Sequence, residues 1–423
     1  MPGAGRVGST MAGGVGAASL RVWLGLLGAA ALGITGPAAA QVSFSTLYSF
    51  SGSGSDGGSP RSTLVFDQAG NLYGTSSQFS AGGYIFELSP PAGGSGAWTE
   101  TTLYGTNSLL YPPASLIIDS SGDLYGTSSG GSLETKSESG TVFELSPPAG
   151  EVTRWTIQVL RNFAGPNKLP GRLLLDSAGN LFGTTANGGA KDGGTVFELT
   201  PTPSGWVKTA LCSFSASGVP RAGLTADATG HLFGTTSGGG SGFGTVFALT
   251  LVPGVGWERS VLYRFTGGAD GGAPITDLLM DAAGNLYGTT SAAGANGGGT
   301  VFELSPPAIG TGTYAWTETT LLGFGGTEAS PAAALVMDAT GNLYGVTAGG
   351  GSSGFGTLYE LSPPASPGSA WTHTILYRFT GSGDGGTPKG GLALAGSGLL
   401  YGTTTRGGAH NAGTIFRVTL LGG

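Results

Sequence analysis

The chain has 423 residues, of which 85 are Gly and 23 are Pro, and only 10% are charged. This length exceeds what one hydrophobic core usually organises, so it predicts several domains or a modular array. The formal charge of -7 excludes proteins that bind nucleic acids or anionic membranes, because both need a basic surface. The 39% hydrophobic content and the scarcity of charge favour a folded chain over a disordered one.

Residues 1–40 predict a secretory signal peptide. They contain Arg6 and Arg21 and no acidic residue, and an apolar run at 22–34 precedes small residues up to Ala40. A basic region, a short apolar core and a small-residue cleavage point are the parts of such a signal, and the apolar run is too short to span a bilayer comfortably. We therefore expect cleavage after Ala40, export to the cell envelope or the outside, and a mature chain without a membrane span.

A ten-residue phrase, DAAGNLYGTT at residues 281–290, recurs along the remainder of the chain. Six copies contain an aspartate at the same position, and a degenerate seventh copy, LAGSGLLYGTT, begins at Leu394. The six aspartates are Asp67, Asp119, Asp176, Asp227, Asp281 and Asp338, and successive ones lie 51 to 57 residues apart. A period of this length is typical of a β-propeller, in which each repeat forms one blade.

Each repeat holds four short apolar or alternating segments separated by Gly, Pro, Asp and Ser. They are a Pro-x-x-x-Leu segment before the aspartate, the LYGT segment, a GTVFEL segment, and a segment that starts near a Trp. Because no helical period appears, residues 41–423 predict an all-β fold, a single seven-bladed β-propeller of four-stranded antiparallel blades. We expect the Leu-x-x-Asp strand, which ends in the repeated aspartate, to line the central channel and the Trp segments to lie outside.

The two ends of the repeat region are incomplete in complementary ways. SFSTLYSF, at residues 43–50, matches only the fourth segment, and the residues from Leu392 onward match only the first three. We therefore expect the N-terminal strand to complete the last blade, which would remove the exposed sheet edges that promote aggregation.

The recurring aspartate is interpreted as part of a turn. In Asp-x-x-Gly-Asn, Asp suits the first position of a type I turn and Gly suits the left-handed conformation that ends a hairpin loop. Six equivalent aspartates are a poor match to catalysis, which needs one tuned group. The Gly of LYGT lies inside a strand, where we expect it to leave space for a neighbouring group.

Two further residue types recur at fixed positions. Six tryptophans are expected to pack between blades rather than to form sugar-stacking platforms, and they are Trp98, Trp155, Trp206, Trp257, Trp316 and Trp371. Five glutamates share one position in the third segment, and they are Glu87, Glu144, Glu198, Glu303 and Glu360. We expect these glutamates to be exposed at a strand end, because the chain has too few Lys and Arg to pair each of them if they were buried.

No residue is assigned to catalysis, to a cofactor or to a metal. Asp56, Asp270 and Asp384 each stand alone in a Gly-rich loop, whereas calcium usually needs several carboxylates, so a calcium site in these loops stays an open alternative. The histidines, His231, His373 and His410, show no metal-ligand spacing.

Other candidate motifs have structural explanations. Cys212, the single cysteine, is interpreted as a small strand hydrophobe, so no internal disulfide is expected. Residues 126–130 and 350–354 match GxSxG and residues 381–386 match GxGxxG, but the strand and helix context that gives these motifs meaning is missing.

The consensus DxxGNLYGTTxxGGxxxxGTVFELSPP resembles the GloVer tandem repeat of exported bacterial proteins, over residues 43–419. The resemblance implies export and a surface or extracellular role, and it implies no activity. Members of that family often end in a C-terminal anchoring segment, whereas this chain has only LLGG after TIFRVT. The turns are also similar to those of NHL-type and gluconolactonase-type propellers, which is a likeness of fold that carries no function.

We expect a monomeric, non-catalytic scaffold that binds a glycan or a protein, with specificity in the variable loops that begin at Ser129 and Pro306. The alternatives are a propeller enzyme acting on a polysaccharide or a lactone, and a structural envelope component. The charged residues that break the repeat pattern are candidates for a channel-mouth site, and they are Arg172, Lys191, Arg221, Lys389 and Arg406. A deep channel pocket of unlike polar groups would favour the enzyme, and a flat polar or aromatic face would favour binding.

Overall fold

The structure is a computed structural model that describes residues 41–421 apart from 55, 79–81, 106–114, 129–139, 164–170, 308–314, 327, 367 and 397. The predicted signal peptide lies outside the described residues, as does most of the two variable loops at Ser129 and Pro306. The described residues form strands, turns and loops, and they contain no helix that is long and apolar enough to cross a membrane.

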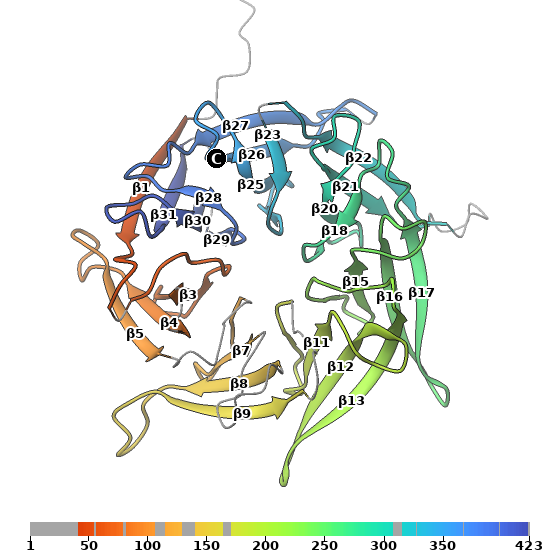
Figure 1. The fold of residues 1–423 in the computed structure, drawn as a ribbon, viewed down its shortest axis with the longest axis horizontal. Helices are drawn as coiled ribbons and strands as arrows, with labels where there is room; N and C mark the ends of the chain where they lie inside the picture. Colours follow the sequence, from red (N-terminus) through yellow and green to blue (C-terminus); the bar gives the residue numbers. More distant parts are fainter. Residues whose placement is uncertain are drawn as a thin grey trace, which may run out of the picture. The chain divides into compact units, whose positions relative to one another are not determined.

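The described strands form seven antiparallel sheets, which makes the protein a seven-bladed β-propeller (Figure 1). Each blade has four main strands arranged from the centre outward, in chain order except in blade seven, and the blades are numbered one to seven along the chain. The first strands are β2 (Val65–Phe66), β6 (Ile117–Ile118), β10 (Leu174–Leu175), β14 (Thr225–Ala226), β19 (Leu279–Met280), β24 (Val336–Met337) and β29 (Ala393–Ala395). The second strands are β3 (Leu72–Gln78), β7 (Leu124–Ser128), β11 (Leu181–Thr185), β15 (Leu232–Thr236), β20 (Leu286–Ala292), β25 (Leu343–Gly350) and β30 (Leu399–Arg406).

The third and fourth strands complete each blade. The third strands are β4 (Gly82–Ser89), β8 (Thr141–Ser146), β12 (Asp192–Thr202), β16 (Thr245–Val252), β21 (Thr300–Ser305), β26 (Thr357–Ser362) and β31 (Thr414–Leu421). The fourth strands are β5 (Thr99–Gly105), β9 (Thr156–Asn162), β13 (Gly205–Ser215), β17 (Gly256–Arg264), β22 (Thr317–Gly323), β27 (Thr372–Arg378) and, next to β31, the N-terminal strand β1 (Gln41–Ser49). The strand that carries the Trp segment is outermost, as predicted (Figure 1).

Three blades contain one strand more than the sequence predicts. Blades five, six and seven begin with β18 (Gly272–Pro274), β23 (Glu328–Pro331) and β28 (Gly386–Pro388), each of which pairs with the second strand of its own blade. β18 and β28 follow Asp270 and Asp384 in their Gly-rich loops. They pair because the second strand is long enough to extend past the first strand, as the pair Gly272 and Ala292 shows.

The pairing register explains the spacing within a repeat. In blade five, Met280 pairs with Leu286, and the intervening residues form the tight turn. Leu286 then pairs with Leu304, so the alternating Leu residues of neighbouring strands lie on one face of the sheet. The Gly of LYGT gives the predicted space, because a Cβ on Gly288 would lie 2.6 Å from Cζ of Phe302.

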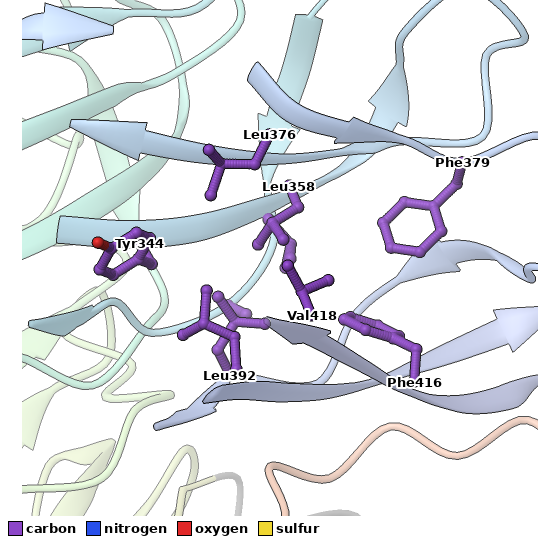
Figure 2. Packing of buried hydrophobic residues seen from close by; sticks show 10 residues of the cluster. Tyr344, Leu358, Leu376, Phe379, Leu392, Phe416 and Val418 are labelled. Atoms are coloured by element: carbon purple, nitrogen blue, oxygen red, sulfur yellow. The ribbon is translucent and has the colours of Figure 1, made fainter. Parts of the chain in front are cut away.

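The hydrophobic core is divided among the interfaces between blades. Seven clusters of buried side chains each combine residues of two neighbouring blades, including blades seven and one. Figure 2 shows the cluster between blades six and seven, where Tyr344, Leu358 and Leu376 of one blade face Leu392, Phe416 and Val418 of the next. Because burying each such side chain contributes about 1.5–3 kcal/mol, the blades are held by their neighbours rather than by cores of their own.

A recurring contact, which we call the latch, joins the start of one blade to the preceding blade. The residue before a proline has a positive φ, donates its N–H to a carbonyl of the preceding blade, and places the proline ring against a glycine there. In blade four, Val219 N–H bonds the Gly193 carbonyl at 3.0 Å and Pro220 contacts Gly194. The latch residues with positive φ are Ser59, Val219, Ala273, Ser330 and Thr387. A left-handed conformation before proline is unfavourable, so the surrounding contacts hold it in place.

Candidate functional site

The repeated aspartate forms the predicted turn between the first and second strands. Asp281 Oδ1 accepts the N–H groups of Ala283 and Asn285 at 2.9 and 2.8 Å, and its Oδ2 accepts the Asn285 amide and the Tyr287 hydroxyl. Gly284 has a φ of 85° and donates to the Asp281 carbonyl. The carboxylate is therefore satisfied within its own hairpin, which confirms the structural interpretation. In the copy at Asp227, His231 replaces Asn and bonds the carboxylate at 2.8 Å.

The tryptophans pack between blades, as predicted. Trp371 of blade six lies edge-on to Tyr287 of blade five, with ring centroids 6.3 Å apart. The same contact joins Trp316 to Phe233 and Trp257 to Phe182 across the two preceding interfaces. Each of the six tryptophans is half-buried, and five of them have a ring contact with the second strand of the blade before.

The prediction for the five glutamates is wrong. They are half-buried in the third strands, because those strands lie inside the sheets and neighbouring side chains cover them. Their carboxylates bond to hydroxyl groups rather than to Lys or Arg: Ser305 donates to Glu303 at 3.0 Å, and Tyr125 donates to Glu144 at 3.3 Å. Burial, together with the charges of Asp123 and Asp119, raises the pKa of Glu144. Burial and Asp176 likewise raise the pKa of Glu198.

The aspartates of the Gly-rich loops also bond within the protein. Asp270 accepts the Tyr263 hydroxyl at 3.0 Å and the Thr266 N–H at 2.7 Å, and Asp384 accepts the equivalent Tyr377 hydroxyl at 3.0 Å. Burial alone would raise the pKa of Asp270, but the hydrogen bonds from Thr266 and Tyr263 outweigh it and hold the pKa below its ordinary value. These loops are therefore closed by hydrogen bonds between carboxylate and hydroxyl groups.

The central channel contains a cavity of about 140 Å³ whose lining residues come from all seven blades. The residues that line it belong to the Pro-x-x-x-Leu segments, which directly precede the Leu-x-x-Asp strands that were predicted to line the channel. The lining residues are Arg61, Thr63, Ser115, Gly171, Arg172, Arg221, Ile275, Thr276, Asp277, Ala332, Ala333, Ala334, Lys389 and Gly391. The strand cores repeat the same residues from blade to blade, whereas the residues of these segments that line the cavity differ between most blades.

Hydrogen bonds between blades hold the channel wall together. The Thr63 N–H donates to Ser115 Oγ at 2.8 Å, and the Gly391 N–H donates to Thr63 Oγ1 at 3.0 Å. The Gly223 N–H donates to Asp277 Oδ1 at 2.6 Å. In each of these three contacts, a side-chain oxygen of one Pro-x-x-x-Leu segment accepts a backbone N–H from the same segment of the preceding blade. The bond holds the two segments side by side along the channel.

Charge in the cavity is strongly unbalanced toward cations. Four of the described lining residues are Arg or Lys and one is an acid, Asp277, whose Oδ2 lies 4.0 Å from Arg172 Nε. Among the described residues, no ion pair within 4.0 Å involves Arg61, Arg221 or Lys389, whose side chains are exposed. The cavity is therefore a cationic site in an acidic chain.

The structure separates the five charged residues that the sequence selected. Arg172, Arg221 and Lys389 meet in the channel cavity. Lys191 and Arg406 do not line it, and both are exposed, Lys191 next to β12 and Arg406 at the end of β30. Sequence reasoning missed Arg61 and Asp277. Their position within the Pro-x-x-x-Leu segment was the signal that could have found them, since residues of that segment line the cavity in every blade.

The remaining candidates lie apart from the cavity. Cys212 is half-buried in β13, and burial raises the pKa of its thiol. His373 in β27 lies 3.6 Å from Glu328, and burial lowers its pKa. His410 is exposed in the link between β30 and β31. The described residues contain no group of three or more His, Cys, Asp or Glu side chains that could hold a metal ion.

An all-β ring of seven blades around a lined channel defines the protein as a β-propeller built from tandem repeats. The Gloeobacter/Verrucomicrobia repeat family matches residues 169–416, and the chain belongs to this family. The predicted relationship to GloVer repeats is thereby confirmed. A crystal structure of a protein of unknown function from Dyadobacter fermentans DSM 18053 is similar over 90% of this chain and 99% of its own, with 11% sequence identity and a TM-score of 0.45. No curated protein matches the chain.

Proposed function

We propose that the protein is an exported, non-catalytic binding scaffold whose ligand site is the mouth of the central channel. The observation that carries this proposal is the variation of the lining. The strand cores repeat the same Leu, Phe and Thr in most blades because each blade has the same packing to satisfy. The residue directly after the latch proline, by contrast, is Arg61 in blade one, Arg221 in blade four, Ile275 in blade five, Ala332 in blade six and Lys389 in blade seven. Side chains without a shared packing role are free to serve a ligand.

The size of the cavity limits what enters it. Pockets that enclose a whole drug-sized molecule measure about 300–1,000 Å³. The channel cavity of about 140 Å³ therefore suits one small group, such as a terminal sugar of a glycan or a side chain of a protein. The remainder of the ligand would lie across the surrounding loops, which connect the rigid strands and tolerate variation.

Unlike polar groups in a channel pocket are also the feature expected of the rival, a propeller enzyme. The described lining offers one carboxylate, and Asp277 already accepts the Gly223 N–H and lies near Arg172. General acid–base chemistry needs a group positioned to exchange a proton with the substrate. The donors and cations of this cavity support binding more directly than proton transfer, so the binding scaffold is the function we propose.

A panel of neutral and acidic oligosaccharides, screened by the thermal unfolding midpoint of the purified protein, tests the proposal. A ligand at a hundred times its dissociation constant stabilises the protein by about 2.7 kcal/mol, which the midpoint resolves. Ala332→Phe fills the cavity and should abolish binding, whereas Ala283→Phe, on an exposed turn outside the cavity, should not. Binding that survives Ala332→Phe would place the site elsewhere, and conversion of a bound sugar into product would establish the enzyme instead.

A further inference from the structure

The mouth of the channel concentrates positive charge in a protein that is acidic overall. The chain has 24 Asp and Glu against 17 Lys and Arg, yet four of those cations line this one cavity against a single acid. If these residues were an average sample of the surface of this chain, acids would outnumber cations among them, whereas the cations outnumber the acids. A cleft with walls of low dielectric also focuses such a field and raises the local concentration of anions.

Three of the four cations directly follow a latch. Arg61, Arg221 and Lys389 each follow the proline of a latch directly. The residues before those prolines, Ser59, Val219 and Thr387, have φ values of 47°, 44° and 54°. Their N–H groups bond carbonyls of the preceding blades at 2.6, 3.0 and 2.7 Å. The backbone that carries each cation is thus fixed before a ligand arrives, which reduces the ordering cost of binding.

Three of the four cations have no ion-pair partner among the described residues. The fourth, Arg172, shares Asp277 with the Gly223 N–H. Arg61, Arg221 and Lys389 form no ion pair with any described acid. Like charges that converge on one cavity repel each other, and an anion placed among them would relieve that repulsion.

Neutral groups complete the lining. The hydroxyls of Thr63 and Ser115 line the cavity, and each accepts a backbone N–H of a neighbouring segment, a bond that does not use the hydrogen of the hydroxyl. Between the cations of blades four and seven, blades five and six contribute Ile275 and Ala332. The cavity therefore offers charged donors and hydroxyl donors together with an apolar wall.

We propose that the channel mouth binds an oxyanion, a carboxylate, phosphate or sulfate group carried by the ligand, with Arg61, Arg221 and Lys389 as the binding cations. This inference rests on the proposed function, because it assigns a chemical class to the group that enters the channel. Arginine and lysine bind such groups through charge-assisted hydrogen bonds, and arginine does so in a bidentate geometry.

Titration calorimetry and the thermal unfolding midpoint of the full protein test the inference with three probes: sodium phosphate, sodium sulfate and sodium galacturonate. Ionic strength is held constant with sodium chloride, because screening alone acts on every exposed charge. We expect at least one oxyanion to bind where chloride does not, and the preferred probe identifies the source of the anionic group.

Variants then locate the site. Arg61→Gln, Arg221→Gln and Lys389→Gln should each weaken binding of that oxyanion by about 10-fold or more, since each removes a charge-assisted hydrogen bond to the anion. Lys191→Gln and Arg406→Gln remove the same charge from exposed positions outside the cavity and should leave binding unchanged. Arg61→Lys and Arg221→Lys, which keep the charge, should retain part of the affinity even if a Gln variant folds poorly.

Two outcomes would overturn the inference, and both differ from failure of the proposed function. The first is that none of the oxyanions binds more tightly than chloride. The second is that the control variants lose as much affinity as the channel variants. If Ala332→Phe abolished binding of a neutral sugar and the three Gln variants left that binding unchanged, the anion site would be refuted. The channel would still be a binding site.

Discussion

Replacing Gly299 by alanine should disrupt the latch between blades five and six. Gly299 is buried, has a φ of 91°, and receives the ring of Pro331 from the next blade. A Cβ at this position would overlap the carbonyl oxygen of Thr290 and would lie 3.1 Å from Cδ of Pro331. Neither neighbour moves easily, because one is strand backbone and the other is a ring.

The expected loss of stability combines two terms. A left-handed conformation costs an alanine about 1–2 kcal/mol. Forcing a methyl group into a packed site typically adds about 1–3 kcal/mol. Gly297 provides the matched control, because its φ is 77° but a Cβ there meets no atom within 4 Å. We therefore expect Gly299→Ala to lower the free energy of unfolding by about 3 kcal/mol and Gly297→Ala by about 1 kcal/mol.

Equilibrium urea unfolding measures both variants against the unaltered protein. If the slopes of the transitions agree, the difference between midpoints reports the difference in stability. Equal midpoints for the two alanine variants would show that the backbone conformation alone sets the cost. The latch as a packed contact between blades would then be refuted.

Two further predictions concern the turns and the tryptophans. Burial alone would raise the pKa of Asp338, but hydrogen bonds from Thr340, Asn342 and Tyr344 outweigh it and lower the pKa. The resulting stabilisation is present above the unfolded pKa of about 3.9 and is lost as the pH falls through the lower folded value. Asp338→Asn should thus destabilise by about 1 kcal/mol at pH 7 and flatten the decline of stability below pH 4 in acid titrations followed by circular dichroism. Trp371→Ala removes a half-buried ring from Tyr287 and should cost about 2 kcal/mol in urea unfolding, less than the 3–5 kcal/mol of a fully buried ring. An unchanged midpoint would contradict its role in packing between blades.

The repeat could be predicted from the sequence because its turns depend on interactions between residues close together in the chain. The Asp-x-x-Gly-Asn turn is built from hydrogen bonds within a few residues, so Asp281 and Asn285 predict it without knowledge of the remaining fold. Strand number and blade number follow from the period of these turns, because each hairpin must bury its apolar face against the next. The tryptophans could be assigned to packing for the same reason, since one large aromatic side chain at a fixed place in each repeat indicates a contact that every blade makes.

The burial of the glutamates depended on tertiary structure. Glu303 looks like a polar residue in an alternating strand, and the sequence does not reveal that neighbouring strands cover it or that Ser305 donates to it. Whether a strand residue is exposed depends on what packs over the sheet, and that partner comes from distant parts of the chain. The additional strands β18, β23 and β28 were not predicted for a similar reason, since their pairing needs a second strand that extends beyond the first.

By itself, the sequence determined the all-β architecture, the repeat and the turns, because these rest on interactions between residues close together in the chain. Only the tertiary structure decided which charges meet. Arg61, Arg172, Arg221 and Lys389 are far apart in sequence and lie in four different blades, and the ring brings the start of each blade to one channel. The pattern separated Arg172, Arg221 and Lys389 from the consensus but grouped them with Lys191 and Arg406, which lie elsewhere. A repeat predicts equivalent positions, whereas a site depends on which of those positions face a common space.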